Sequence, residues 1–277
     1  MLSYKHGYHA GNQADVLKHI CLIQAYKSLK KYYNSISYID THAGSGNYSF
    51  KNEYMEKNKE YENGIKKLEN YKYENQSIKY YIKVLRNINN SKKLTFYPGS
   101  PVIMSYLSDN NDKLSFYELH NNEFKLLRKE LSKQINSKVY NKDGFDFINQ
   151  KISLNEKTLV LIDPSYEIKE DYNKVVNTLK ILNENYSNLT AIIWYPVLNI
   201  ENNDLFIENI RKLGSNRITR IELPLKKYNE EIGMKGNGII LFDGTNFLIK
   251  QMKECVKELY QILKEENCNI KPKIQKI

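Results

Sequence analysis

The sequence predicts an α/β protein with a mostly parallel sheet, helices on both of its faces and one antiparallel strand near the C-terminus. Short apolar segments alternate with amphipathic ones along most of the 277 residues, and strands that alternate with helices form parallel sheets. The first apolar segment ends in a glycine-rich loop, residues 40–46, which is typical of α/β sheets that bind a nucleotide. The last two apolar segments follow each other without a helix between them, which indicates a hairpin and hence the antiparallel strand.

The N-terminal half contains a long segment that interrupts this alternation. Apolar residues at helical spacing predict a helix over 15–33, and a short strand follows over 36–40. From about 51 to 93 the chain is charged, rich in tyrosine and without a strand pattern. We therefore interpret residues 50–95 as a helical insertion within a single domain spanning 1–277. The elements predicted after it are a helix opened by Pro101, a strand over 114–119, a helix over 122–134 and a strand over 138–141.

The C-terminal half resumes the alternation and contains the most apolar strand, residues 158–162. The elements predicted around it are a short helix at 145–151, a helix at 172–185, a strand at 189–197, a helix at 204–213, strands at 218–223 and 238–243, and a helix from 247 to about 266. The remaining tail is basic, and we expect it to be frayed.

Charge and composition limit the class of protein without identifying it. Lys and Arg number 42 against 32 Asp and Glu, a net charge of +10 that suits a phosphate backbone or an anionic membrane surface. Lys, Asn, Ile and Tyr are all abundant, as they would be in an AT-rich coding sequence, so the charge permits binding to nucleic acid but does not establish it.

The cysteines and the N-terminus indicate where the protein works. Cys21, Cys255 and Cys268 are scattered without the spacing of a zinc ribbon, which favours a reducing compartment. The first fifteen residues lack the apolar region of a signal peptide, and no apolar run approaches the ~20 residues that cross a bilayer. We expect a soluble cytoplasmic monomer that does not contact a membrane.

Four residues that follow the most apolar strand, Asp163-Pro164-Ser165-Tyr166, should face the ligand crevice at the carboxyl end of the sheet. The exocyclic amine of adenine is a poor nucleophile because its lone pair is delocalised into the ring, so a site that alkylates it must accept its hydrogen bonds. The Asp163 carboxylate and the Pro164 carbonyl suit that task, and the Tyr166 ring can stack on a base taken out of its helix. The same tetrapeptide could form an ordinary turn, and its place between a strand and a crevice is what favours the functional interpretation.

The glycine loop and two further strand ends indicate the ligand. A lone GxG fits NAD-binding sheets as well. The absence of a third glycine at helix-packing distance and the pairing with Asp-Pro-x-Tyr favour S-adenosylmethionine. Glu118 ends the next strand, where an acidic residue holds ribose hydroxyls, and Asp143 and Gly144 end the third, where the adenine ring would lie. The five histidines show no metal-ligand spacing, so we expect no metal ion.

These motifs belong to a resemblance that covers nearly the whole chain. It is most specific in six segments, residues 1–6 (MLSYKH), 9–19 (HAGNQADVLKH), 40–44 (DTHAG), 97–101 (YPGSP), 118–120 (ELH) and 194–197 (WYPV). With them the chain resembles the bacterial ribosomal RNA adenine-N6 methyltransferases of the RlmJ type, which act on the large subunit. The resemblance implies a Rossmann-like S-adenosylmethionine-dependent methyltransferase sheet with a small helical insertion.

The resemblance also implies roles for individual residues. Asp163 would be the catalytic proton acceptor and Tyr4 would contact the substrate RNA. The residues implied to bind S-adenosylmethionine are His19, His42, Ser100, Glu118, Asp143 and Gly144. One position departs from the family pattern Asp-Pro-Pro-Tyr, because Ser165 replaces the second proline. A proline restricts the residue before it, so its loss could loosen the loop, but the carboxylate, the carbonyl and the ring remain and we expect activity to survive.

We therefore expect a 23S ribosomal RNA (adenine-N6)-methyltransferase that needs no metal ion. Asp163 and the Pro164 carbonyl would accept hydrogen bonds from the amine while Tyr166 stacks on the extruded base, so that catalysis rests on positioning and electrostatics. A DNA adenine-N6 methyltransferase is an alternative, because the motif contacts the amine and not the sugar. A catalytically silent RNA-binding or assembly protein is another, with Ser165 as a mark of decay.

The insertion has two open interpretations. Its basic residues are interleaved with tyrosines, a mixture that can neutralise phosphates and stack on unpaired bases. The basic residues are Lys66, Lys67, Lys72, Lys79, Lys83, Arg86, Lys92 and Lys93, and the tyrosines are Tyr71, Tyr73, Tyr80 and Tyr81. The same segment carries Glu53, Glu56, Glu60, Glu62, Glu69 and Glu74, as an ordinary solvated pair of helices would. If the insertion does not bind RNA, we expect the RNA-binding face around Tyr4 and Lys5.

Overall fold

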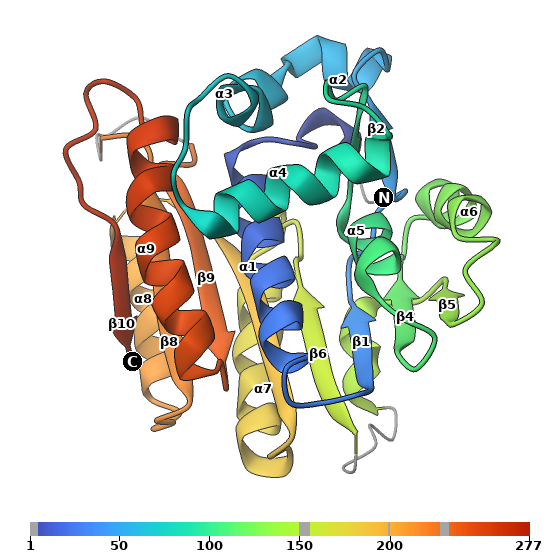
Figure 1. Ribbon diagram of the computed structural model, residues 1–277. Coiled ribbons are helices and arrows are strands. Elements are labelled where there is room, and N and C mark those ends of the chain that lie inside the picture. Colours follow the sequence, from blue (N-terminus) through green and yellow to red (C-terminus); the bar gives the residue numbers. More distant parts are fainter. Residues whose placement is uncertain (1–4, 150–155, 199, 228–232) are drawn as a thin grey trace.

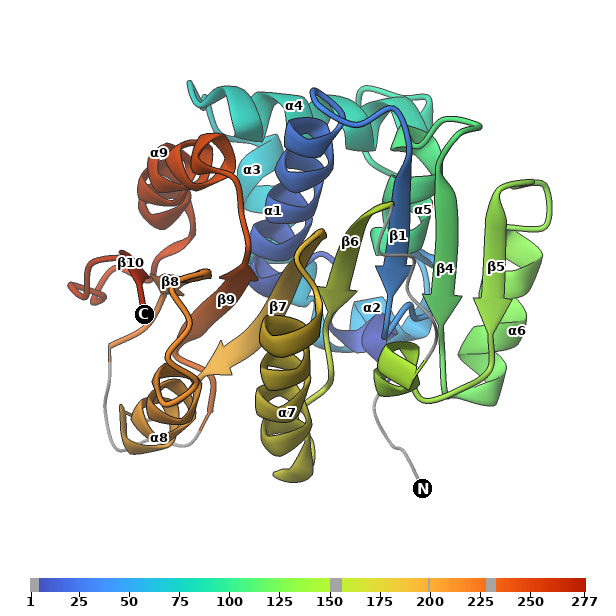
Figure 2. The same ribbon diagram turned by 90° about the horizontal axis from the view of Figure 1, so that it is seen from below.

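The computed structural model describes residues 5–149, 156–198, 200–227 and 233–277, and it has three layers (Figures 1 and 2). The middle layer is an eight-stranded sheet with the order β10-β8-β9-β7-β6-β1-β4-β5. Its strands are β1 (Ile36–Asp40), β4 (Lys113–Tyr117), β5 (Ser137–Tyr140), β6 (Lys157–Ile162), β7 (Leu189–Val197), β8 (Ile218–Pro224), β9 (Gly236–Phe242) and β10 (Lys273–Lys276).

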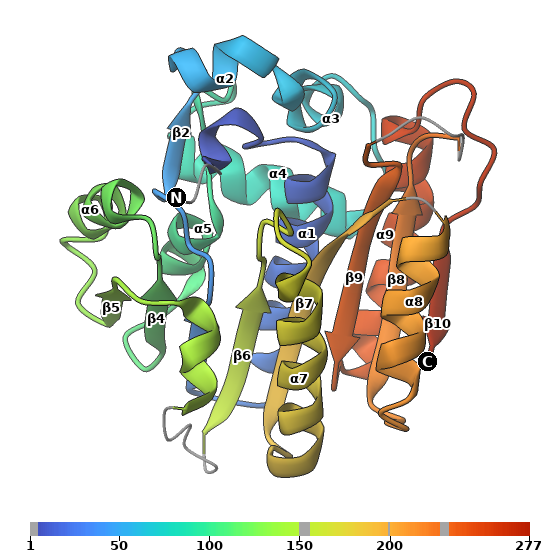
Figure 3. The same ribbon diagram turned by 180° about the vertical axis from the view of Figure 1, so that it is seen from behind.

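Helices cover both faces of the sheet. The face toward the viewer in Figure 1 carries α1 (Gln13–Leu29), α4 (Gln76–Asn89), α5 (Ser100–Leu107) and α9 (Asn246–Leu263). The opposite face, seen in Figure 3, carries α7 (Glu170–Asn185) and α8 (Ile200–Arg211). Helix α6 (Asn121–Glu130) lies beside β5, and a short 3-10 helix, η3 (Gly144–Asn149), follows that strand. Each face of the sheet packs its own cluster of buried apolar side chains.

Helix α1 is buried on nearly all sides, because α4 and α9 cover the face that it turns away from the sheet. It begins at Asn12, whose side chain accepts hydrogen bonds from the backbone N–H groups of Ala14 and Asp15. This cap satisfies donors that a helix start otherwise leaves unpaired. Because the helix has almost no solvated face, its polar residues Asp15, Lys18 and His19 are buried as well.

The strand order reverses between β1 and β6, where ligands bind in open α/β sheets. Strand β1 pairs in parallel with β4 on one side and with β6 on the other. The sheet extends from β4 to β5 on the first side and from β6 to β7 on the second. Strand β9 pairs antiparallel with both β7 and β8, which confirms the hairpin expected from the sequence. The carboxyl ends of β1, β4, β5 and β6 therefore open at one edge of the sheet.

The proposed insertion, residues 50–95, lies between the two strands of a short ladder that the sequence did not predict. Strands β2 (Asn47–Ser49) and β3 (Phe96–Pro98) pair antiparallel and bring the two ends of the segment together. Between them lie α2 (Glu53–Asn58), η2 (Glu60–Glu62), α3 (Ile65–Glu69) and α4. Its apolar side chains belong to the same core as α1, and the Ile65 N–H donates to the Gly11 carbonyl over 2.8 Å. The insertion is thus packed on the start of α1.

Several boundaries differ from those expected. The tail was expected to be frayed, and this is wrong, because β10 pairs antiparallel with β8 at the edge of the sheet. The helix expected at 145–151 is the 3-10 helix η3, and α8 begins at residue 200 and not at 204. No helix in the described ranges is both long and apolar enough to span a membrane.

Candidate active site

Residues from four strand ends line one cleft of about 270 Å³. Its walls come from the glycine loop after β1, the ends of β4 and β5, the loop after β6 and the first turn of α7. The expected cofactor residues His42, Glu118, Asp143 and Gly144 all line it, together with Asp163. We call this space the cofactor cleft.

Glu118 holds the glycine loop in place. Its two carboxylate oxygens accept hydrogen bonds from the backbone N–H groups of Gly44, at 2.8 Å, and His120, at 2.7 Å. Burial raises the pKa of Glu118, and these two N–H groups offset part of the rise. Gly44 has a φ of 63°, and a Cβ there would lie 2.2 Å from the Tyr48 hydroxyl oxygen. The loop therefore needs glycine at this place and a carboxylate at Glu118 to fix its amides.

Asp143 and Gly144 sit where β5 meets the β1 loop. The Asp143 carboxylate accepts from the Phe145 N–H and from Lys174 Nζ, each at 3.0 Å. Burial tends to raise the pKa of Asp143, but these two donors outweigh it and the pKa is lowered. A Cβ on Gly144 would lie 1.8 Å from the Thr41 carbonyl oxygen, so only glycine permits this close approach of the two loops.

A second, larger space of about 450 Å³ adjoins the cofactor cleft, and His6, Asp163, Ser165 and Glu167 line both. All three expected catalytic residues, Asp163, Pro164 and Tyr166, line it, and Trp194 belongs to the same wall. We call this space the base pocket. Between it and the cofactor cleft is a hollow of only about 10 Å³, lined by residues that include His19, His42, Ser100 and Asp163.

Tyr166 adopts an unusual backbone conformation. Its φ is 53°, a left-handed conformation that a bulky side chain adopts only when its surroundings hold it there. The Tyr166 hydroxyl donates to the Trp194 carbonyl over 2.7 Å, and its ring lies 4.5 Å from the Tyr172 ring, centroid to centroid. Ser165 stands where the family pattern Asp-Pro-Pro-Tyr has its second proline. Its hydroxyl accepts a hydrogen bond from the Glu167 N–H over 3.5 Å.

Lys18, which was not predicted as a site residue, forms an ion pair with Asp163. Its Nζ also lies 2.7 Å from Asp15 Oδ1, so one buried ammonium bridges two carboxylates. The other Asp15 oxygen accepts from the Gly11 N–H over 2.8 Å and lies 3.0 Å from His6 Nε2. Burial would lower the pKa of Lys18, but the two carboxylates outweigh it and the pKa is raised.

Two histidines of the small hollow, His19 and His42, have lowered pKa values that favour the neutral ring. Burial lowers the pKa of His19 to about 3 and that of His42 to about 4. His19 Nδ1 lies 2.7 Å from the Tyr97 hydroxyl, which fixes the ring. Ser100 hydrogen-bonds to the Asp40 carboxylate, another residue without an expected role, and burial raises the pKa of Asp40 to about 6. Lys18, whose pKa is raised, brings a positive charge to this hollow.

The signal for Asp15 and Lys18 was present in the sequence. Both are charged residues three positions apart within an otherwise apolar helical segment. A charged pair there is expected to be solvated, but both side chains are buried, and Lys18 faces Asp163 and the loop after β1. Tyr4, the residue expected to contact RNA, lies outside the described residues. Among the residues that are described, no three His, Cys, Asp or Glu side chains are grouped so as to hold a metal ion.

The cofactor cleft is acidic, although the protein as a whole is basic. Six carboxylates line it, against one lysine, Lys174. The six are Glu118, Glu123, Asp143, Asp163, Glu167 and Asp171. Such a cleft attracts a cationic ligand and repels phosphate groups.

Comparison with known proteins identifies the group to which this site belongs. Residues 33–273 match the model of the family described as Ribosomal RNA large subunit methyltransferase D, RlmJ. The chain belongs to the RlmJ family. Two curated relatives of the family, each named Ribosomal RNA large subunit methyltransferase J, are 34% identical to it. The relative from Escherichia coli (strain K12) matches 95% of this chain and 94% of its own length, and that from Haemophilus influenzae matches 96% and 95%.

A solved structure shares the fold of this RlmJ-family chain over nearly its full length. The crystal structure of protein LPL1258 from Legionella pneumophila superposes with a TM-score of 0.85 at 31% identity. The match covers 97% of this chain and 98% of that one. The family resemblance and the fold class expected from the sequence are thereby confirmed.

Replacement of Glu118 should weaken binding of S-adenosylmethionine. Glu118→Ala removes the carboxylate that fixes the glycine loop and that would hold the ribose hydroxyls. Hydrogen bonds to a charged group are worth about 1.5–3 kcal/mol, so we expect roughly a ten- to hundredfold loss of affinity by calorimetry. Glu118→Gln, which keeps one acceptor oxygen, should lose less. Unchanged affinity in Glu118→Ala would exclude the residue from the cofactor site.

Proposed function

We propose that this chain transfers a methyl group from S-adenosylmethionine to the N6 amine of an adenine in 23S ribosomal RNA. One observation carries the proposal: Asp163 lines both the cofactor cleft and the base pocket. The group that accepts hydrogen bonds from the amine must lie where the methyl donor and the target adenine meet. A carboxylate that lines both spaces meets that requirement. The proposed setting is the cytoplasm, where the enzyme would act as a monomer.

The chemistry of the cofactor cleft supports S-adenosylmethionine as its ligand. This cofactor supplies a methyl group made electrophilic by a sulfonium centre, and its positive charges suit the six carboxylates of the cleft. Glu118 would hold the ribose hydroxyls and Asp143 the adenine. His120 also lines the cleft, and its buried Nδ1 has no hydrogen-bond partner among the described residues, so it offers a further polar contact.

The base pocket supports an adenine as the acceptor. Asp163 and the Pro164 carbonyl would accept the two hydrogens of the amine, which localises the nitrogen lone pair for attack. Tyr166 and Trp194 give the pocket aromatic walls against which an extruded base can stack. Asp163 would then take up the proton that leaves the methylated nitrogen. The protein contributes positioning and electrostatics, and the phosphates of the RNA stay outside.

Lys18 would position Asp163 for this task. It binds Asp163 Oδ2, which leaves Oδ1 to accept from the amine. Burial raises the pKa of Asp163, and the Lys18 ammonium opposes that rise. Asp15 in turn holds Lys18 at 2.7 Å from the opposite side. Lys18 therefore acts through Asp163, by keeping the carboxylate ionised and by fixing its orientation.

Replacement of Asp163 tests the central assignment. Asp163→Ala should abolish methyl transfer to 23S ribosomal RNA while S-adenosylmethionine still binds, because Asp163 is proposed to act on the amine. Methyl incorporation and calorimetry measure the two properties separately. Normal turnover at saturating cofactor, combined with a collapse of cofactor affinity, would show that the catalytic assignment is wrong.

The activity itself is tested by mapping N6-methyladenine in 23S ribosomal RNA from cells with and without the gene. One methylated adenine should disappear with the gene. Purified protein should methylate RNA in preference to DNA of the same sequence. A preference for DNA would favour the DNA methyltransferase, and an enzyme that binds no S-adenosylmethionine would favour the silent binding protein.

Lys18→Met should lower kcat and move the acidic limb of the kcat/KM profile to higher pH. Without the ammonium the pKa of Asp163 rises further, so the active carboxylate is lost at a higher pH than in the native enzyme. Lys18→Arg, which keeps a cation, should return the limb toward its original place. Combining Lys18→Met with Asp15→Asn removes both charges of the pair and avoids an unpaired carboxylate in α1. A limb that stays in place in folded Lys18→Met would leave Lys18 a purely structural residue.

A further inference from the structure

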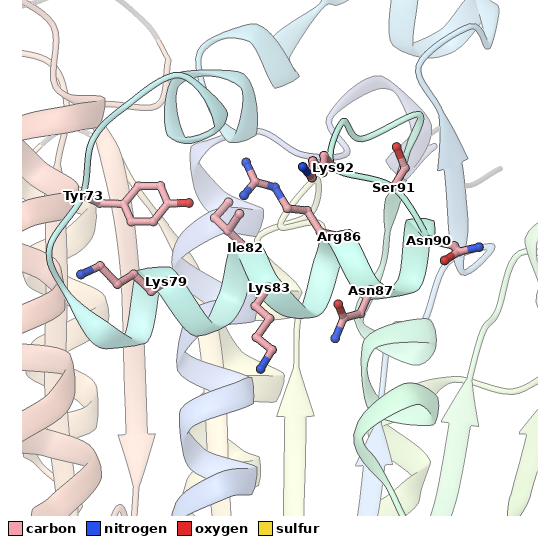
Figure 4. Close-up of a pocket in the computed structure, with 9 residues that line it drawn as sticks. All are labelled: Tyr73, Lys79, Ile82, Lys83, Arg86, Asn87, Asn90, Ser91 and Lys92. Carbon is pink, nitrogen blue, oxygen red and sulfur yellow. The ribbon is translucent and has the colours of Figure 1, made fainter.

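The insertion forms a groove on the outer side of α4, away from the sheet (Figure 4). Its volume is about 640 Å³. It lies between α4, the loop before that helix and the loop after it, and four of the residues that line it are cations, Lys79, Lys83, Arg86 and Lys92. No acidic residue is among the described residues that line it.

The acids of the insertion lie outside the groove, and two of them have partners elsewhere. Glu60 binds the His9 ring and the Asn12 amide, and Glu69 binds Lys66 and the Leu94 N–H. The remaining four glutamates of the segment are also outside the groove. Basic and acidic residues that are interleaved in the sequence are thus separated in space. A solvated pair of helices with mixed charges would not produce a concave surface of one sign.

The cations of the groove do not form ion pairs with the described carboxylates of the protein. Lys79, Lys83 and Lys92 are exposed, and in the part of the chain that the structure describes none of the four cations forms an ion pair with a carboxylate. Arg86 is half-buried, and its Nε has no hydrogen-bond partner among the described residues although it is shielded from solvent. A buried donor without a partner carries a free-energy cost that a bound acceptor would remove.

Neutral groups in the groove suit the same kind of ligand. Asn87, Asn90 and Ser91 add hydrogen-bonding side chains beside the cations, and the half-buried Tyr73 ring stands at one end. Tyr81, which the sequence offered for stacking, is buried in the core and bonded to the Tyr97 hydroxyl, so it cannot serve. Cations mixed with amides and hydroxyls are the side chains that contact the phosphates and sugars of nucleic acids.

The position of the groove separates it from the catalytic centre. Helix α4 covers one face of the sheet, whereas α7, whose first turn lines the cofactor cleft, covers the other (Figures 1 and 3). The acidic cofactor cleft repels phosphates, so RNA that delivers a base to the adjoining base pocket must be held by other surfaces. Resting on the proposed function, we propose that the groove on α4 binds backbone phosphates of the substrate RNA at a distance from the target adenine.

Neutralising the groove tests this proposal. The variant Lys79→Gln/Lys83→Gln/Arg86→Gln should bind 23S ribosomal RNA at least about tenfold more weakly at low salt. The slope of log affinity against log salt should flatten by about 2–3, because each lost phosphate contact contributes roughly 0.7–0.9. The matched control is Lys250→Gln/Lys253→Gln/Lys257→Gln, which removes the same charge from exposed positions of α9. Fluorescence anisotropy across a salt series measures both variants.

The length of the RNA makes the test specific. Fragments of 23S ribosomal RNA, shortened stepwise around the methylated adenine, should lose their sensitivity to the groove variant once they no longer reach α4. Cofactor affinity and melting temperature should stay unchanged in the variant. An unchanged salt slope, or an equal loss in the α9 control, would overturn the proposal. Methylation of 23S ribosomal RNA by the native enzyme is measured alongside, so that failure of the groove is distinguished from failure of the proposed function.

Discussion

Much of this structure depends on the burial of one charged side chain, Lys18, between two carboxylates. Its side chain is 4% exposed, and it lies between Asp15 on its own helix and Asp163 at the end of β6. Removing one partner from a buried ion pair costs about 3–5 kcal/mol, because a charge is left without compensation. The pair therefore constrains how α1 docks on the sheet. It also brings a cation to Asp163, the proposed proton acceptor, so the same contact would serve both packing and chemistry.

The insertion is connected to this ion pair through the start of α1. Glu60 accepts from the Asn12 amide at 2.9 Å and lies 2.8 Å from His9 Nδ1. Burial would lower the pKa of His9, but Glu60 outweighs it and the pKa is raised. Asn12 caps α1, and His9, Asn12 and Glu60 all line the base pocket. A segment that is far from Asp163 in the sequence thus forms part of the pocket that Asp163 lines.

The parts of the site that the sequence predicts are those fixed by the geometry of parallel strands. Asp163, Glu118 and Asp143 were expected to converge because each lies at or just after the end of a predicted strand. The carboxyl ends of parallel strands share one edge of the sheet. Strands β2, β3 and β10, of three or four residues each, are too short to carry a recognisable alternation. Lys18 is buried against Asp163 and the loop after β1, which are distant in the sequence, so the charged pair in α1 marks the residue without revealing its burial.

The distribution of charge is consistent with RNA binding by a basic protein whose cofactor cleft is acidic. The carboxylates gather where strands end and the proposed cofactor brings positive charge, whereas the unpaired cations of the insertion gather on α4. Under the two proposals, the phosphates would be held on α4 while only an uncharged base enters the base pocket beside the acidic cleft. This division of charge also accounts for the open prediction about the insertion. Its composition is mixed, and its function depends on which charges the fold pairs internally and which it leaves facing a concave surface.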